Sequence, residues 1–271
     1  MIVFSSIKTK HFYQSRAMNK RREEAILKQL EACDFLTTEQ AMKLVGGSAA
    51  TIRRAFIRLA ETNLARRVHG GLRRLPVGGD GSLPFVMRER WFEDEKARLA
   101  ARAIEFFPKG GVAFIHGGST TLKLTQHIRS GTIITDSINV CGSFMQRFSS
   151  GGGPEILLPG GTLDLRGDAL YGPRTEAALR EYRADVVFFS ARGMDEEGLL
   201  DTSDTLVATV RLMMRNASLR VMLADHSKFR KFGLTQMAPW ENVDVLVTSD
   251  HPENRPWFET IKNHGVKIVF A

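Results

Sequence analysis

The chain has 271 residues, which is enough for one large domain or two ordinary ones, and its 43% hydrophobic content suits a globular protein with a substantial core. No run approaches eighteen apolar residues, and residues 1–17 lack the apolar segment of a signal peptide, so we expect no membrane partner. Two cysteines, Cys33 and Cys141, are too few for a disulfide framework or a cysteine metal site, and they favour a reducing cytoplasm.

The positive charge is concentrated at the front of the chain. Residues 1–75 hold 15 Lys and Arg against 6 Asp and Glu, a net charge of +9. Residues 76–271 hold 23 against 24, a net charge of −1. Because phosphate neutralisation supplies most non-specific DNA affinity, this asymmetry indicates a DNA-binding domain joined to a domain with another task. We place the DNA-binding domain at residues 18–75 and assign no role to residues 1–17.

The first predicted elements are two short helices. Residues 21–32 carry apolar side chains at helical spacing, and residues 34–36 read as a short break. Thr37 and Gln40 have the spacing of a capping box, which opens a second helix that runs to Leu44. The side chains expected on the inner faces of these helices are Ala25, Ile26, Gln29, Leu30, Ala41, Leu44 and Val45.

A third helix follows a tight glycine turn. Gly46 and Gly47 end the second helix, and Ser48 is a natural N-cap for a helix over residues 49–62. Ile52, Phe56 and Leu59 fall on one face of it. Three short helices with such a turn make a helix-turn-helix, whose third helix presents its N-terminal residues to the major groove.

A basic hairpin completes a winged helix-turn-helix. Residues 64–68 and 72–75 flank the compact turn His69-Gly70-Gly71, which predicts a two-stranded wing near the DNA phosphates. A basic helix is often only a solvated face, so the prediction depends on the ordered succession of caps, turn, helix and hairpin. The residues that we expect to contact double-stranded operator DNA are Ser48, Thr51, Arg53, Arg54, Arg58, Arg66, Arg67 and His69.

These motifs resemble the DeoR family of bacterial transcriptional regulators. The resemblance lies in Arg21-Arg22 with Ile26-Leu27, in Thr51-Ile52-Arg53-Arg54, and in the run from Arg66 to Gly71. It implies a winged helix-turn-helix followed by a domain that senses a phosphorylated sugar. The family usually has an acidic residue after the two arginines of the third helix, where this chain has Ala55, so operator preference is expected to differ.

The second part of the chain predicts an α/β domain over residues 91–271, after a Gly- and Pro-rich linker at 76–90. Apolar strand-like runs alternate with amphipathic helices, which favours a parallel sheet covered on both faces. The expected strands are 111–116, 132–135, 155–159, 184–190, 219–224, 243–248 and 266–270. The expected helices are 93–107, a helix ending at 128, one ending near 148, 174–182 and 203–216.

Polar or glycine-rich residues follow five of these strands. In parallel sheets ligands bind beyond the carboxyl ends of the strands, so we expect these residues to share a pocket. Glycines, hydroxyls and a lysine suit a phosphate, and Asp or Asn side chains suit sugar hydroxyls. The expected effector-binding residues are Gly118, Ser119, Thr120, Thr121, Asp136, Ser137, Asn139, Gly160, Gly161, Gly193, Asp225 and Lys228.

The resemblance to DeoR regulators continues here, through Gly118–Thr121, Thr135–Ser137, Leu158–Gly161 and Ala224–Phe229. It implies a fold related to sugar-phosphate isomerases and a repressor that leaves DNA on binding a phosphorylated sugar or polyol. His116-Gly117 and Asp136 depart from the family pattern, which leaves the identity of the ligand open.

Two other functions are compatible with these residues. Asp136, Asp225 and Lys228 could serve as acid and base groups of a sugar-phosphate isomerase that carries a DNA-binding domain. Alternatively, the chain is an activator or architectural DNA binder whose second domain only dimerises. We expect a cytoplasmic, nucleoid-associated regulator without catalytic residues, cofactor or metal. A single recognition helix needs symmetry for specificity, so a homodimer or homotetramer is expected.

Overall fold

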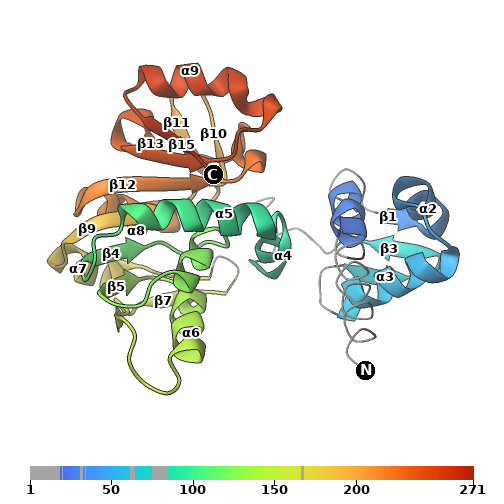
Figure 1. The fold of residues 1–271 in the computed structure, drawn as a ribbon, viewed down its shortest axis with the longest axis horizontal. Helices are drawn as coiled ribbons and strands as arrows, with labels where there is room; N and C mark the ends of the chain where they lie inside the picture. The colour runs from blue at the N-terminus through green and yellow to red at the C-terminus, as the bar shows by residue number, and fades with distance from the viewer. Residues whose placement is uncertain are drawn as a thin grey trace, which may run out of the picture. The chain divides into compact units, whose positions relative to one another are not determined.

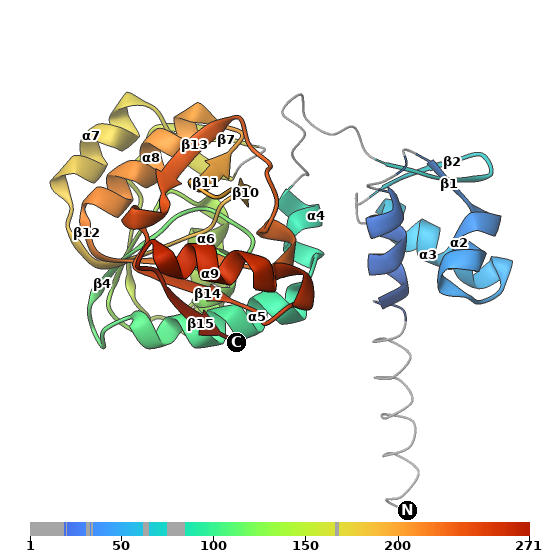
Figure 2. The same cartoon turned by 90° about the horizontal axis from the view of Figure 1, so that it is seen from above.

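The computed structural model describes residues 19, 21–30, 33, 35–61, 65–74, 85–165 and 168–271. The chain divides into two compact units, Met1–Gly79 and Asp80–Ala271, which Figures 1 and 2 show as ribbons. We call them the head and the body. Residues 1–17 and residues 76–84 of the expected linker lie outside the described residues.

The described residues of the head form three helical segments and a small antiparallel sheet. Residues 21–30 are helical. They are followed by β1 (Phe35–Thr37), α2 (Thr38–Val45), α3 (Ala49–Glu61), β2 (Arg66–Val68) and β3 (Gly71–Arg73). The sheet has the order β1-β3-β2, with both pairs antiparallel. This arrangement is a winged helix-turn-helix, as the sequence predicts.

The predicted helix caps are present. The hydroxyl of Thr37 accepts from the backbone N–H of Gln40 at 3.1 Å, and the Gln40 amide oxygen accepts from the N–H of Thr37 at 2.8 Å. The capping box at the start of α2 is therefore confirmed. The N–H of Thr51 donates to the hydroxyl of Ser48 at 3.3 Å, which caps α3.

The expected break at residues 34–36 is wrong at Phe35 and Leu36, which belong to strand β1. Leu36 lies opposite Leu72 of β3, and both side chains are buried. Strand β3 would otherwise expose one edge, so pairing with the β-favouring residues of β1 satisfies its backbone groups. The wing therefore has three strands.

Most side chains expected in the core of the head are buried, including Ile52, Phe56 and Leu59 of α3. Leu44 is an exception, because 45% of its surface is exposed. The inner side of α2 passes through Ala41 and the half-buried Val45, a spacing of one helical turn, and Leu44 lies outside it.

Gly71 occupies a position where a side chain would collide with its neighbours. A Cβ there would lie 2.3 Å from the carbonyl oxygen of Leu36 and 2.8 Å from the Phe35 ring. We expect Gly71→Ala to destabilise the head by about 1–3 kcal/mol, because β1 and β3 must separate. Differential scanning calorimetry of the full chain would measure this. Gly70→Asn is the control. Gly70 has a φ of +81°, which asparagine tolerates, and no atom lies within 4 Å of a Cβ placed there. Equal losses of stability in both variants would contradict the steric explanation.

The body begins with a helix that the sequence assigns to the linker. Its helices are α4 (Phe85–Arg90), α5 (Glu93–Ala103), α6 (Ile138–Arg147), α7 (Pro173–Glu181), α8 (Asp204–Arg215) and α9 (Arg255–Asn263). Short 3₁₀ turns are η1 (Ile104–Phe106), η2 (Thr121–Gln126), η3 (His226–Lys228), η4 (Trp240–Asn242) and η5 (Pro252–Asn254). The expected α-helix ending at residue 128 is thus the 3₁₀ segment η2.

Seven strands form the main sheet of the body. They are β4 (Val112–Ile115), β5 (Thr132–Thr135), β6 (Glu155–Leu157), β9 (Ala184–Phe189), β12 (Ala217–Ala224), β14 (Val245–Thr248) and β15 (Lys267–Phe270). Their order is β15-β14-β12-β9-β4-β5-β6, and every neighbouring pair is parallel. The predicted parallel α/β domain is confirmed.

Alternate side chains of this sheet enter two separate cores. Phe114 and Val187 pack in one cluster with residues of α7, α8 and α9, whereas Ala113 and Phe188 pack in the other with residues of α5 and α6. The strands are apolar throughout because both faces are covered.

Two smaller sheets lie outside the predicted pattern. Strands β10 (Gly193–Met194), β11 (Gly198–Asp201) and β13 (Thr235–Pro239) form an antiparallel sheet. Strands β7 (Thr162–Asp164) and β8 (Ala169–Tyr171) form an antiparallel hairpin. These strands are two to five residues long, too short for a clear alternation of polar and apolar residues.

Candidate functional site

The head presents arginines on both the third helix and the wing. Arg53 and Arg54 of α3 are exposed, as are Arg66 and Arg67 of β2. Ser48 and His69 are exposed and Thr51 is half-buried. These side chains are accessible to a polyanion, and the segments that carry them belong to one compact unit.

Arg58 differs from the other expected DNA contacts. Its Nε lies 2.6 Å from a carboxylate oxygen of Glu23, which joins α3 to the helical residues 21–30. The side chain of Arg58 is 40% exposed and that of Glu23 20% exposed. Arg58 therefore contributes to the packing of the head, where sequence reasoning expected only a contact with DNA.

A polar pocket of the body lies at the topological switch point of the sheet, between β4 and β9. Strands β5 and β6 extend the sheet on one side of β4, whereas β9 and the later strands extend it on the other. A crevice forms at such a switch point, beyond the carboxyl ends of the two strands. The pocket is lined by Arg88, His116, Gly117, Gly118, Ser119, Thr120, Ser190, Ala191, Arg192, Asp201, Leu206 and Lys228.

Four of the expected effector residues line this pocket, namely Gly118, Ser119, Thr120 and Lys228. Sequence reasoning missed several others. Arg88 lies in the segment taken as linker, and Arg192 precedes the singled-out Gly193. Neither Ser190 nor Asp201 belongs to a recognisable motif. The only signal for Ser190 is that it ends a predicted strand, and Asp201 has no such signal.

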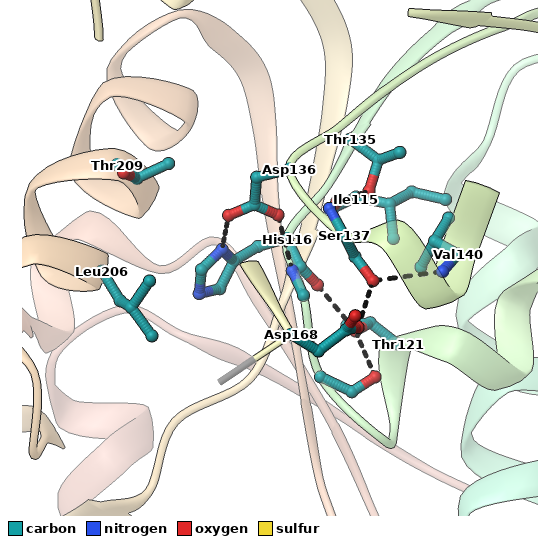
Figure 3. A network of polar contacts seen from close by, with 12 residues as sticks. Ile115, His116, Thr121, Thr135, Asp136, Ser137, Val140, Asp168, Leu206 and Thr209 are labelled. Atoms are coloured by element: carbon teal, nitrogen blue, oxygen red, sulfur yellow. Dashed lines mark hydrogen bonds and ion pairs between the residues drawn. The ribbon is translucent and has the colours of Figure 1, made fainter. Parts of the chain in front are cut away.

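Behind the pocket a network of hydrogen bonds holds the loop that follows β4 (Figure 3). Asp136 is fully buried, and its carboxylate accepts from Nδ1 of His116 at 2.7 Å and from the N–H of Gly117 at 2.8 Å. The hydroxyl of Thr121 donates to the carbonyls of His116 and Gly118 at 2.7 and 3.0 Å. Asp136 and Thr121 thus shape the pocket without lining it.

Ser137 belongs to the same framework. Its hydroxyl donates to Asp168 at 2.5 Å and accepts from the N–H of Val140 at 3.1 Å, which caps α6. The N–H of Asn139 donates to the other oxygen of Asp168 at 3.1 Å. Burial raises the pKa of the Asp168 carboxyl more than these hydrogen bonds lower it.

The remaining expected residues also lie off the lining. A Cβ on Gly193 would lie 2.5 Å from the carbonyls of Arg230 and Phe232, and one on Gly161 would lie 2.0 Å from the Thr175 hydroxyl, so both glycines permit close packing. The carbonyl of Gly160 accepts from the Thr175 hydroxyl at 2.6 Å. Asp225 caps the turn that carries Lys228, accepting from the N–H and hydroxyl of Ser227.

His116 joins the framework to the pocket. In Figure 3 its ring lies between the carboxylate of Asp136 and the side chain of Leu206. Burial lowers the pKa of the imidazole, but the charge and hydrogen bond of Asp136 outweigh this and hold the pKa above its ordinary 6.5.

Positive charge dominates the lining. Arg88, Arg192 and Lys228 face the pocket with one carboxylate, Asp201. Burial, reinforced by the neighbouring arginines, lowers the pKa of Lys228 to about 8, although Asp225 opposes the shift. Burial and the charge of Arg192 lower the pKa of Arg88 to about 9. Such crowding of like charges favours the binding of an anion.

In the part of the chain that the structure describes, no helix is long and apolar enough to cross a membrane, and no cluster of His, Cys, Asp or Glu is arranged to hold a metal.

A winged helix-turn-helix joined to an α/β domain with a cationic pocket defines a DNA-binding transcriptional regulator with a separate sensor. Residues 22–76 match the family model of the DeoR-like helix-turn-helix domain, and residues 91–250 match that of the DeoR C terminal sensor domain. The chain belongs to the DeoR family. We therefore call the body the sensor domain.

Relatives of similar length are regulators as well. The chain is 28% identical over 254 residues to the glycerol-3-phosphate regulon repressor of Haemophilus influenzae. The alignment covers 92% of this chain and 96% of that protein. It is 28% identical over 252 residues to the HTH-type transcriptional repressor GlcR of Bacillus subtilis, covering 92% and 95%. Among solved structures, ribose 5-phosphate isomerase A from Methanocaldococcus jannaschii superposes with a TM-score of 0.38 at 20% identity, covering 51% of this chain and 55% of that one.

Proposed function

We propose that this regulator is a repressor whose head binds operator DNA until an anionic metabolite, a phosphorylated sugar or polyol, fills the pocket of the sensor domain. The cationic lining of Arg88, Arg192 and Lys228 around the loop Gly117–Thr120 carries the proposal. The names of the relatives agree with it, since one is the repressor of a glycerol-3-phosphate regulon.

The roles of the pocket residues follow from their positions. Lys228 and the arginines supply charge to a phosphate, and the hydroxyls of Ser119 and Thr120 supply hydrogen bonds. Asp201 and the hydroxyl of Ser190, which has no hydrogen-bond partner among the described residues, suit sugar hydroxyls. Asp136, Ser137 and Asn139 hold the loops in place, a role different from the ligand contact that their sequence motifs suggest.

Two of the three groups that an isomerase would use as acid and base are buried outside the pocket, which also favours a sensor; the third, Lys228, lines the pocket. Asp136 is 0% exposed and Asp225 is 1% exposed, and neither lines the pocket. A general base has to reach the proton that it removes. Incubating the protein with pentose and hexose phosphates should therefore give binding without turnover, and isomerised product would overturn this part of the proposal.

The central experiment measures operator binding with and without metabolite. Fluorescence anisotropy on DNA from beside the gene should give salt-dependent binding that glycerol 3-phosphate, glucose 6-phosphate or ribose 5-phosphate weakens. A coupling free energy of about 1–3 kcal/mol corresponds to about 5- to 150-fold weaker binding. Binding that no phosphorylated metabolite changes would favour the architectural alternative. Light scattering on the same complexes would test the proposed homodimer or homotetramer.

Arg54→Ala is expected to weaken operator binding by about 1–3 kcal/mol, since Arg54 is exposed on the predicted recognition helix. Metabolite affinity should not change, because the head and the sensor domain are separate units. Arg54→Lys is the matched control. If Arg54 contacts a phosphate, Arg54→Lys should keep both the operator affinity and its salt dependence. If Arg54 makes a bidentate contact to a base, Arg54→Lys should lose affinity, because lysine lacks the forked guanidinium. Unaltered operator affinity in Arg54→Ala would remove this residue from the interface.

A further inference from the structure

Lys96 of α5 is a buried lysine beside the pocket that the proposed function does not use. The residue is 2% exposed and lies off the lining. Its ammonium donates to the backbone carbonyl of Arg88 and, at 3.2 Å, to the hydroxyl of Ser119. Burying an ammonium costs free energy that an apolar side chain would not. The contact with Ser119 connects this buried charge to the pocket, because Ser119 is part of the lining.

The contact between Lys96 and Ser119 fixes the direction of a hydrogen bond. A charged ammonium has three N–H donors and no lone pair, whereas a serine hydroxyl has one donor and two lone pairs. The Ser119 oxygen therefore accepts from Lys96, and the hydroxyl hydrogen needs an acceptor elsewhere. No group of the described residues accepts this hydrogen, and the side chain lies at the pocket. The hydroxyl is thus free to donate to a ligand.

The proton of Lys96 controls this direction, because a neutral amine has a lone pair and can itself accept from the hydroxyl. Burial lowers the pKa of the Lys96 ammonium to about 7. The charge of Asp225 opposes this shift, and three neighbouring cations add to it, namely Lys228, Arg88 and Lys123. An anion bound beside these groups would favour the charged ammonium again. Binding of an anion and protonation of Lys96 should therefore support each other.

We propose that Lys96 is a positioning residue of the effector site, whose charged ammonium holds the Ser119 hydroxyl as a donor towards the pocket and so requires an unprotonated acceptor there. Because Lys228 and Arg192 line the same pocket, that acceptor is an oxygen of a phosphate dianion rather than a sugar hydroxyl. The inference rests on the proposed function, since it takes this pocket to be the effector site. It predicts that effector affinity falls as Lys96 loses its proton.

Sulfate is the probe that separates this coupling from titration of the ligand, because sulfate stays a dianion at both pH values used. Isothermal titration calorimetry on the full chain at about pH 6 and about pH 8, with chloride of equal ionic strength as the reference, brackets the pKa of about 7. Wild type should bind sulfate more weakly at the higher pH. At the lower pH, Lys96→Met should bind it about tenfold more weakly than wild type, because the hydroxyl is no longer held as a donor.

Ser119→Ala tests the route through which Lys96 acts. Deprotonation of Lys228, whose pKa is about 8, weakens binding in every variant, so the variants are compared with one another. Without the hydroxyl, sulfate affinity should fall less between the two pH values than it does in wild type. Adding Lys96→Met to Ser119→Ala should weaken binding by a smaller factor than Lys96→Met does alone, because both changes remove the same hydrogen bond.

Lys123→Met is the matched control. The side chain of Lys123 is 7% exposed, pairs with Glu93 at 3.2 Å and lies off the lining of the pocket. Its removal should leave the sulfate affinity at the lower pH unchanged, since Lys96 is charged there. A loss equal to that of Lys96→Met would show that any buried charge nearby has this effect, and would overturn the role of the contact with Ser119.

The outcomes separate this inference from the function beneath it. Multiplicative losses in the double variant, or an equal fall with pH in wild type and Ser119→Ala, would overturn the role of Lys96 and leave the anion pocket intact. Wild type that binds no sulfate at either pH would contradict the anion pocket, and this inference with it. The comparison of wild type with Ser119→Ala decides even where Lys96→Met fails to fold.

Discussion

Asp136→Ala is expected to lower the free energy of unfolding of the sensor domain by about 3–5 kcal/mol, the cost of leaving a buried partner uncompensated. The carboxylate is 0% exposed, and its loss leaves the His116 imidazole and the Gly117 N–H without an acceptor. All three tryptophans, Trp91, Trp240 and Trp257, lie in the sensor domain. Tryptophan emission of the full chain during urea denaturation therefore follows this domain.

An exposed ion pair provides the control for this prediction. Asp250 lies 2.9 Å from the guanidinium of Arg255, and the two side chains are 51% and 63% exposed. Asp250→Ala should change stability little, because solvent screens the pair. A similar loss in both variants would show that burial of Asp136 does not set the cost.

The pH dependence of the buried His116–Asp136 pair has a definite sign. Because Asp136 raises the pKa of His116 in the folded protein, the pair contributes stability below the ordinary value of 6.5 and loses it as the pH rises through the folded pKa. The difference in unfolding free energy between wild type and Asp136→Asn should therefore be larger at about pH 6 than at about pH 9. A difference that grows with pH would contradict a charged His116.

Lys228→Ala is expected to abolish release from operator DNA by the phosphorylated metabolite while operator binding itself persists. Removing a desolvated cation that holds an anion costs about 2–5 kcal/mol, or about 30-fold or more in metabolite affinity. Lys228 lines the pocket of the sensor domain, whereas the expected DNA contacts belong to a separate compact unit. Isothermal titration calorimetry and anisotropy would measure the two affinities separately.

Lys231→Ala is the matched control for Lys228→Ala. Lys231 lies three residues further on, is 63% exposed and pairs with Glu196 at 2.7 Å. Its removal should leave both affinities unchanged. Metabolite release that persists in Lys228→Ala would take this lysine out of the effector site.

The fold could be predicted closely where local patterns decide it. The capping box at Thr37 and the apolar strands of the main sheet are encoded in adjacent residues, and the structure contains both. Strand β1 was not predicted, because it is only three residues long and forms by pairing with β3, which lies more than thirty residues away in the sequence. The hairpin β7–β8 and the sheet β10-β11-β13 depend on tertiary contacts in the same way.

The structure brings four of the twelve expected effector residues to one cavity, and the effector site itself stays a prediction. Parallel topology brings the residues after β4 and β9 together, so Gly118, Ser119 and Thr120 could be expected at one edge. Sequence alone does not separate a residue that faces a ligand from one that supports it, as Asp136 shows. Arg88 was missed because α4, with six residues after a glycine-rich stretch, gives little helical periodicity.

The position of α4 determines where the protein can be cut without damage. The match to the sensor-domain family model begins at residue 91, yet Arg88 of α4 lines the pocket and its backbone carbonyl accepts a hydrogen bond from the buried ammonium of Lys96. A fragment that starts at residue 91 would retain every strand of the main sheet and lose one arginine, Arg88, from the lining of the pocket. We expect fragments that start ahead of Phe85 to respond to phosphate and those that start at 91 to respond weakly, which provides a practical boundary for dissecting the protein.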